Sequence, residues 1–206
     1  MKAVITGSEG FAGKYLVAEL QSHGYQVVGL DLVESDITRK VDLRDAEATR
    51  RMIEEEKPDF VFAGINTGYN ISHDIQYSAT LGAVMEARLW DIPAIAFSQG
   101  NVIYQDVVDR YLIETMEECM NRPLDPGQVW NIHFPCCELA DCKGIQWDVR
   151  VSDDKYYVDS YKDHESSDGA RVFRLAAGRI WKGTEGTDLA AVVENYVAVG
   201  KVRNIG

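Results

Sequence analysis

Three glycines, each three residues from the next, follow a short apolar run near the start of the chain. Residues 3–5 are typical of a buried strand, and the amphipathic pattern of residues 11–23 predicts a helix. Gly7, Gly10 and Gly13 lie between them, where a glycine-rich turn can hold the pyrophosphate of a dinucleotide. A strand, a tight turn and a helix in this order predict an α/β fold with a parallel sheet.

The same alternation of apolar runs and amphipathic stretches continues through the first 120 residues. Strands are expected at 26–30, 40–43, 59–63 and 92–97, and helices at 45–57, 78–90 and 102–120. A glycine-rich loop is expected at 64–70. Right-handed crossovers would then give a Rossmann-like three-layer parallel sheet with helices on both faces.

The pattern changes after Pro123. Strands are expected at 129–134, 145–151, 155–161, 171–175 and 196–199, and a short helix at 187–193. Alternating polar and apolar residues between 145 and 175 predict a C-terminal antiparallel hairpin extension with a polar turn at 162–169. Tyr156, Tyr157 and Tyr161 would be exposed on that hairpin, so we expect a homodimer that covers them. No linker is evident, and residues 1–206 are predicted to form a single domain.

The composition narrows the class of partner. A formal net charge of −12 argues against binding a nucleic acid polymer, whereas backbone amides can still hold a small phosphorylated ligand. No apolar run is long enough for a signal peptide or a membrane span, so we expect a cytoplasmic protein without a membrane partner. The spacing of the clustered cysteines, Cys136, Cys137 and Cys142, does not match a zinc site.

The glycine turn also predicts a dinucleotide site. Gly7 would permit the tight turn, Gly10 the approach of a pyrophosphate, and Gly13 close packing of helix on strand. Asp31 ends the second strand, where a carboxylate can accept a hydrogen bond from a ribose 2′-hydroxyl, which favours NAD over NADP. The alternative is a turn that serves backbone geometry only.

Residues 1–58 resemble the N-terminal Rossmann segment of the extended short-chain dehydrogenases, the NAD-dependent sugar epimerases and dehydratases. The matching stretches are residues 5–13, 29–31 and 42–45, followed by Lys57-Pro58-Asp59. The resemblance implies that Asp42 contacts adenine, and the cofactor-binding set becomes Gly7, Gly10, Phe11, Gly13, Asp31 and Asp42. No tyrosine is followed by a lysine four residues later, so the catalytic pair of that family is missing and its dehydrogenase chemistry is not expected.

Residues 59–200 resemble a different family, the SurE (survival protein E) 5′-nucleotidases. The resemblance rests on an ordered series of segments: 64–70, 74–83, 92–98, 131–135, 186–192 and 195–197. It implies a Rossmann-like, commonly dimeric phosphatase that acts on nucleoside monophosphates with Mg²⁺ or Mn²⁺. The chain is thus interpreted as a mosaic, natural or engineered, with its join near residue 58.

The SurE resemblance also implies a metal site. The asparagine ligand corresponds to Asn66, the two adjacent aspartates fall on Ser8 and Glu9, and the serine ligand falls on Ser35. Ser8 is neutral and Glu9 is longer than aspartate, so the metal centre is expected to be impaired. Glu9 and Asn66 are the expected catalytic residues.

Phosphate-binding groups are expected beside the 64–70 loop. Gly68, with Ser78 and Thr80 at a helix N-terminus, would present amides and hydroxyls to an anion. Ser78 and Thr80 could equally be helix caps, and Asn66 and Asn70 turn stabilisers. The first function hypothesis is a SurE-like nucleotide phosphatase scaffold. Its alternatives are a non-catalytic NAD-binding module and an engineered chimera without evolved activity.

Overall fold

The structure is a computed structural model that describes residues 2–101, 105–164 and 171–203. Contacts within the chain divide it into two compact units. The first comprises Met1–Val61 and Leu89–Ala94, and the second comprises Phe62–Arg88 and Ile95–Gly206. The single-domain organisation stays a prediction. Across the described ranges, no helix has the length and apolar character needed to cross a membrane.

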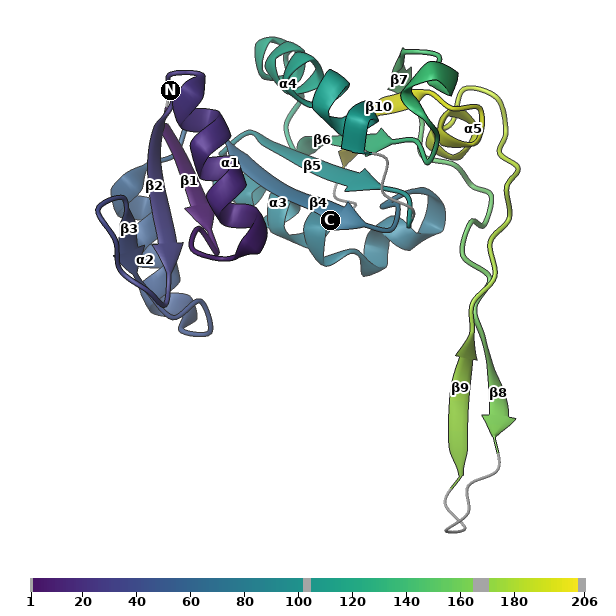
Figure 1. Ribbon diagram of the computed structural model, residues 1–206, viewed down its shortest axis with the longest axis horizontal. Coiled ribbons are helices and arrows are strands. Elements are labelled where there is room, and N and C mark those ends of the chain that lie inside the picture. Colours follow the sequence, from purple (N-terminus) through teal and green to yellow (C-terminus); the bar gives the residue numbers. More distant parts are fainter. Residues whose placement is uncertain (1, 102–104, 165–170, 204–206) are drawn as a thin grey trace. The chain divides into compact units, whose positions relative to one another are not determined.

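The first unit is built on a three-stranded parallel sheet. Its strands are β1 (Lys2–Thr6), β2 (Gln26–Asp31) and β3 (Thr38–Lys40), in the order β1-β2-β3. Helices α1 (Phe11–Ser22) and α2 (Ala46–Glu56) lie on its two faces (Figure 1). This arrangement follows from strand–helix alternation with right-handed crossovers.

Local signals set the helix ends in the first unit. The Asp45 side chain accepts a hydrogen bond from the Ala48 amide and caps α2, and Lys57 ends this helix in a left-handed conformation before Pro58. Gly24, with φ +79°, follows α1, where a glycine carries no steric penalty.

The second unit contains a five-stranded mixed sheet in the order β4-β5-β6-β10-β7. These strands are β4 (Val61–Thr67), β5 (Ala94–Gln99), β6 (Gln128–Phe134), β7 (Ile145–Val149) and β10 (Val197–Arg203). Strand β6 is parallel to β5 and antiparallel to β10, whereas β10 is parallel to β7. Central strand β6 is buried along nearly its whole length, including Trp130, Ile132 and Phe134.

Helices and short 3-10 turns cover this sheet. Helices α3 (Ala79–Leu89) and α4 (Gln105–Asn121) lie on opposite sides of it (Figure 1). The short helix α5 (Asp188–Val193) is capped by Thr187 and is almost entirely buried. The 3-10 turns are η1 (Ser72–Tyr77), which leads into α3, and η2 (Leu139–Asp141).

Strands β8 (Ser160–His164) and β9 (Val172–Ala176) form a separate antiparallel hairpin. Within the described part of the chain, these two strands pair only with each other. Tyr161, Phe173 and Leu175 are all more than half exposed on them. The predicted fold class, a Rossmann-like α/β protein with parallel sheets and a C-terminal antiparallel hairpin, is confirmed.

Two boundaries in the first half were predicted wrongly. The third strand lies at Thr38–Lys40 rather than at 40–43, because Asp42 forms a local turn in which its carboxylate accepts a hydrogen bond from the Arg44 amide. Strand β4 continues to Thr67, into the stretch predicted as a loop. Gly64 permits this, because a Cβ at that position would overlap the Phe97 carbonyl on β5.

Two predictions in the second half were also wrong. Residues 155–161 were expected as a strand with exposed tyrosines. Tyr161 is exposed as expected, but Tyr156 is only 2% exposed and packs against Tyr69. Strand β8 begins later, at Ser160. Residues 145–149 form a strand that pairs in parallel with β10 rather than in an antiparallel ribbon. Burial of aromatic rings in the core outweighed the local alternation that suggested a surface hairpin. Residues 102–104 of the expected helix and residues 165–169 of the expected polar turn lie outside the described residues.

Candidate functional site

The glycine turn of the first unit is closed by backbone hydrogen bonds. The Gly7 amide donates to the Leu30 carbonyl at 2.8 Å, and the Gly10 amide donates to the Gly7 carbonyl at 3.0 Å. Gly7 adopts φ +71°, and a Cβ on Gly13 would overlap the Gly7 carbonyl and the Ser8 backbone. Gly10 precedes α1 as its N-cap, without a side-chain cap. The backbone roles predicted for Gly7 and Gly13 therefore agree with the geometry.

The two acidic residues predicted to contact NAD make local hydrogen bonds. Asp31 Oδ2 accepts from the Glu9 amide at 2.9 Å, and its Oδ1 accepts from the Leu32 amide at 2.6 Å. Asp42 is paired with Arg44, whose Nε and Nη2 donate at 3.0 and 2.7 Å. These bonds lower the pKa of Asp42 to about 2. Of Phe11 only its place as the first residue of α1 is described, and NAD binding by this set stays a prediction.

Three residues predicted to hold a metal ion lie together in the first unit. Glu9 Oε1 accepts hydrogen bonds from the Ser35 and Thr38 hydroxyls, each at 2.8 Å. The Ser8 hydroxyl lies 3.0 Å from Thr38 Oγ1. The Thr38 hydroxyl, followed by that of Ser35, lowers the pKa of Glu9. The Glu9 carboxylate is therefore held in place and ionised at neutral pH.

Thr38 is a member of this cluster that the sequence reasoning missed. It pairs with Gly29 across the parallel β2–β3 register and is 2% exposed. A Cβ on Gly29 would overlap the Ser8 and Thr38 hydroxyl groups, so the glycine makes room for both. A glycine in the middle of an apolar strand was the available signal, since it often marks a close approach of other atoms.

In the second unit, hydrogen bonds connect the loop after β4 with the start of α3. Asn66 Nδ2 donates to the Gly68 carbonyl at 2.8 Å and to Asn70 Oδ1 at 3.2 Å. The Ser78 hydroxyl donates to the same Asn70 oxygen at 2.9 Å and accepts from the Leu81 amide at 3.2 Å. Ser78 thus has the helix-capping role of the alternative interpretation, and it also faces the loop.

Thr80 and Gly68 are the other two residues that were predicted to bind phosphate. Thr80 lies half-buried in the first turn of α3. Gly68 is buried with φ +112°, and its amide donates to the Gln99 carbonyl at 2.8 Å. Because the Gly68 amide already has an acceptor, it is not free to bind a phosphate oxygen. Only the absence of a side chain remains as its predicted contribution.

The predicted metal set includes residues of both units. Ser8, Glu9 and Ser35 belong to the first and Asn66 to the second, so a site made of all four stays a prediction. Among the residues that the structure describes, no three His, Cys, Asp or Glu side chains are grouped to hold a metal. The Asp154 carboxylate accepts hydrogen bonds from the Thr184 amide and hydroxyl.

Comparison with known proteins places most of the chain in one group. The family described as Survival protein SurE matches residues 46–157. This range includes Asn66, Gly68, Ser78 and Thr80 and excludes the glycine turn. The 5′-nucleotidase SurE of Aquifex aeolicus (strain VF5) is 31% identical over 154 residues, which cover 73% of this chain and 60% of the relative. The 5′-nucleotidase SurE of Sulfurovum sp. (strain NBC37-1) is 32% identical over 168 residues, 75% of this chain and 63% of the relative.

A solved structure agrees with the sequence relatives. The crystal structure of SurE protein from Aquifex aeolicus aligns with 100% of this chain and 95% of its own, with a TM-score of 0.73 and 25% identity. The matched regions of the two curated relatives are 60% and 63% of their lengths, so the chain spans less than two thirds of either. Since the family match covers more than half of the residues, the chain belongs to the SurE family.

Proposed function

We propose that the chain is a metal-dependent phosphatase that releases inorganic phosphate from nucleoside monophosphates. The observation that supports this proposal is the hydrogen-bonded loop and helix start formed by Asn66, Asn70 and Ser78, inside the segment that matches SurE. The curated relatives carry the name 5′-nucleotidase SurE. The small nucleotide is the partner that this function requires.

The phosphate would be held at the start of α3. This helix has eleven residues and no acidic side chain in its first turn, so its amides and partial positive charge favour an anion. The Thr80 hydroxyl adds a donor beside it, and Ser78, which donates to Asn70 Oδ1, holds the loop at the helix start. The Gly68 carbonyl accepts from Asn66 Nδ2 at 2.8 Å, which holds the Asn66 side chain at this loop.

The metal would be held by oxygen donors. The Glu9 carboxylate and the Ser8 and Ser35 hydroxyls of the first unit are hard ligands of the kind that Mg²⁺ and Mn²⁺ prefer, and the Asn66 amide oxygen of the second unit is a donor of the same kind. Among the described contacts, Glu9 Oε2 has only Lys14 Nζ near it, at 4.0 Å, and retains lone pairs for an ion. A bound divalent ion would polarise a phosphate oxygen and activate a water molecule. With one carboxylate in the set, we expect weak metal affinity and hence an impaired metal centre.

Phosphate release from AMP with Mg²⁺ or Mn²⁺ tests the proposal. We expect metal-stimulated release that the chelator EDTA abolishes. Glu9→Gln keeps the shape of the side chain but removes its charge, and Asn66→Ala removes the amide oxygen. Each change is expected to lower kcat/KM about 100-fold or more, since altering even the partners of metal ligands costs about 10- to 100-fold.

Asp153→Asn is the matched control for Glu9→Gln. Asp153 is an exposed carboxylate outside the proposed site, and its neutralisation should leave phosphate release unchanged. Release at background level with every metal up to millimolar concentration would reject the proposal. Equal rates in wild-type protein and Glu9→Gln would reject the role of Glu9.

A homodimer through the C-terminal extension belongs to the same proposal. Tyr161, Phe173 and Leu175 are 73%, 52% and 56% exposed on the β8–β9 hairpin, and a second copy would cover them. Sedimentation equilibrium should give twice the chain mass, and the double variant Tyr161→Ser, Phe173→Ser should give the chain mass. A monomeric wild-type protein would refute this part.

NAD binding in the first unit is the second candidate function. The geometry of the turn at Gly7, Gly10 and Gly13 favours it, because the backbone hydrogen bonds and the close approach of α1 are those a pyrophosphate-binding turn needs. The epimerase-like origin of residues 1–58, and with it the mosaic, stays a prediction. The effect of NAD on thermal unfolding tests this candidate.

A further inference from the structure

A buried serine–histidine pair lies at the carboxyl ends of two neighbouring strands in the second unit. Ser98 of β5 and His133 of β6 are Cα partners in the parallel register. Their side chains are 0% and 1% exposed, and Ser98 Oγ lies 2.7 Å from His133 Nδ1. A buried pair of this kind costs free energy to desolvate unless each polar atom has a partner.

The direction of the hydrogen bonds follows from the donor to Ser98. The Asn70 amide donates to Ser98 Oγ at 3.2 Å, so the serine hydrogen is free to point at the ring. A hydroxyl has one hydrogen and two lone pairs, and in the arrangement proposed below that hydrogen goes to His133 Nδ1, which places the ring proton on Nε2. Burial lowers the pKa of His133 to about 3, which keeps the ring neutral and able to accept over the whole physiological range.

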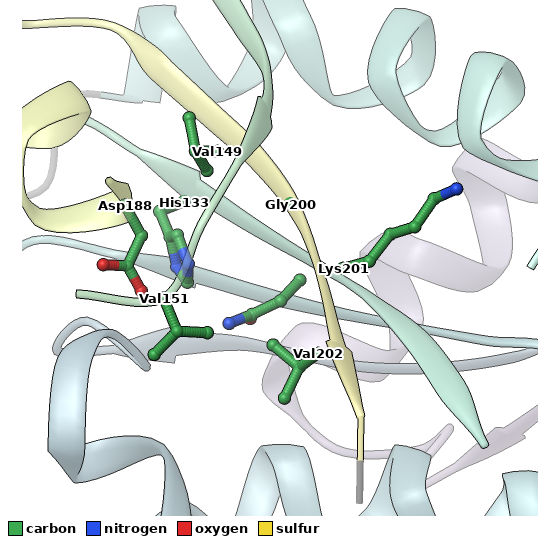
Figure 2. A pocket seen from close by; sticks show the side chains of 8 residues that line it. His133, Val149, Val151, Asp188, Gly200, Lys201 and Val202 are labelled. Carbon is green, nitrogen blue, oxygen red and sulfur yellow. The ribbon is translucent and has the colours of Figure 1, made fainter. Parts of the chain in front are cut away.

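His133 also lines a small cavity. This cavity of about 10 Å³, on the order of one water molecule, is lined by His133, Val149, Val151 and Asp188 (Figure 2). The Asp188 oxygens accept from the backbone amides of Ser72, Ser152 and Leu189. The Tyr69 and His133 rings are perpendicular to each other, with their centroids 6.5 Å apart.

Asn70 is held at both of its backbone polar atoms. Its amide donates to Ser98, and its carbonyl accepts from Asn131 Nδ2 at 2.9 Å. Its side-chain oxygen in turn accepts from Asn66 and Ser78. Within the described contacts, its buried Nδ2 has no acceptor. Asn70 therefore connects Ser98 to Asn66 and Ser78 through hydrogen bonds.

We propose that Ser98 and His133 form a positioning pair, which fixes Asn70 through its backbone and thereby aligns Asn66 and Ser78 for a phosphate monoester. His133 acts through Ser98 and does not touch the ligand. This inference rests on the proposed function, because the alignment of Asn66 and Ser78 serves a phosphate monoester. The hydrogen-bond relay itself can be measured without any nucleotide.

Nitrogen NMR of the wild-type histidine rings tests the relay first. His133 should show an unprotonated, hydrogen-bonded Nδ1 and a protonated Nε2, with shifts that do not change between pH 8 and pH 5. A ring that carries its proton on Nδ1, or that becomes doubly protonated in this range, would overturn the proposal. This measurement needs no variant, so it stands even where a variant does not fold.

Amide exchange in two variants tests the positioning role. In His133→Asn the side-chain oxygen stands at about the place of Nδ1 and can accept from Ser98, whereas His133→Leu offers no acceptor. We expect His133→Leu to speed exchange of the Asn70 amide at least about tenfold relative to nearby amides of β5 and β6, and His133→Asn to restore it to about the wild-type rate. Unchanged Asn70 exchange in His133→Leu, or the same acceleration in both variants, would refute the proposal.

Phosphate release by the same proteins separates this inference from the proposed function. Loss of AMP hydrolysis in His133→Leu and its recovery in His133→Asn would support both. If the wild-type protein hydrolyses nothing but Asn70 exchange follows the expected order, the proposed function fails and the relay stands. If the wild-type protein hydrolyses AMP at a rate that His133→Leu does not change, the positioning role fails although the function is right.

Discussion

Replacement of Asp188 by alanine is expected to lower the free energy of unfolding by about 2–4 kcal/mol, because it leaves buried amide donors without acceptors. Asp188 is 2% exposed at the first position of α5. Its Oδ1 accepts from the Ser152 and Leu189 amides at 2.9 and 2.7 Å, and its Oδ2 accepts from the Ser72 amide at 3.1 Å. One carboxylate thus joins three segments that are distant in sequence.

The contact with Ser72 connects this carboxylate to the candidate site. Ser72 adopts φ +60°, a left-handed conformation that costs a residue with a side chain about 1–3 kcal/mol. It begins η1, the turn between Asn70 and Ser78. The hydrogen bond from its amide to Asp188, together with the one from its hydroxyl to the Asp154 carbonyl, stabilises this conformation. Loss of Asp188 should therefore loosen η1 as well as lower global stability.

Urea unfolding of three proteins measures the effect. Asp188→Asn retains one acceptor oxygen and should cost less than Asp188→Ala, whereas Asp153→Ala, at an exposed carboxylate, should change stability by no more than about 0.5 kcal/mol. A loss below about 1 kcal/mol in Asp188→Ala would show that water replaces the carboxylate at the three amides.

The stability contribution of Asp188 is also expected to depend on pH. Burial raises the pKa of Asp188 to about 6, above its value in an unfolded chain. The folded state then binds the proton more tightly, so this group adds stability as the pH falls through 6 and loses it as the pH rises. Between pH 7 and pH 5 the gain should be about 1 kcal/mol in the wild-type protein, relative to Asp188→Asn. A difference curve that is flat or of opposite slope would contradict the raised pKa.

Segments with a clear hydrophobic pattern, or with a distinct turn or capping residue, were predictable from sequence. The glycine turn, helix α2 between Asp45 and Pro58, and the buried run of β6 each carry a local signal that determines the conformation of a few neighbouring residues. Strand β4 was cut short in the prediction, because a glycine at position 64 resembles a loop signal until the Phe97 carbonyl beside it is known. The correct assignment needed a contact between residues more than 30 positions apart.

Partners across a sheet were the part of the site that sequence reasoning could not supply. Thr38 reaches Glu9 because β3 aligns it with Gly29, and His133 reaches Ser98 because β5 and β6 align them. The register between parallel strands cannot be read from the local sequence, so no hydrogen-bond partner for His133 could be predicted. The segment around Asn66 and Ser78 was found, since its motif lies within fifteen residues and includes both the loop and the helix start.

Replacement of Gly13 by alanine is expected to destabilise the first unit by up to about 2 kcal/mol. A Cβ there would overlap the Gly7 carbonyl and the Ser8 backbone, which cannot move without breaking the hydrogen bond between the Gly7 amide and Leu30. Overpacking against backbone of this kind typically costs about 1–3 kcal/mol, which here should exceed the gain of about 1 kcal/mol in helix propensity.

Gly82 provides the matched control, because it is also a helical glycine but a Cβ on it would meet no atom outside its own helix within 4 Å. Gly82→Ala should therefore raise stability by up to about 1 kcal/mol. Urea unfolding gives the sign of the stability change in each variant. Amide exchange along α1 shows whether the loss of stability in Gly13→Ala begins at the turn. Equal effects at both positions would mean that the close approach of α1 to the turn is not a constraint.

The same pair of variants tests NAD binding, since a ligand that binds only the folded state raises the unfolding temperature by mass action. If the turn holds a pyrophosphate, millimolar NAD should raise the melting temperature of the wild-type protein and of Gly82→Ala, but not that of Gly13→Ala. The geometry of the turn would then serve a ligand as well as the fold. If NAD raises none of the three temperatures while the stability order holds, the glycines serve the backbone alone, and the first unit contributes to function only through the cluster around Glu9.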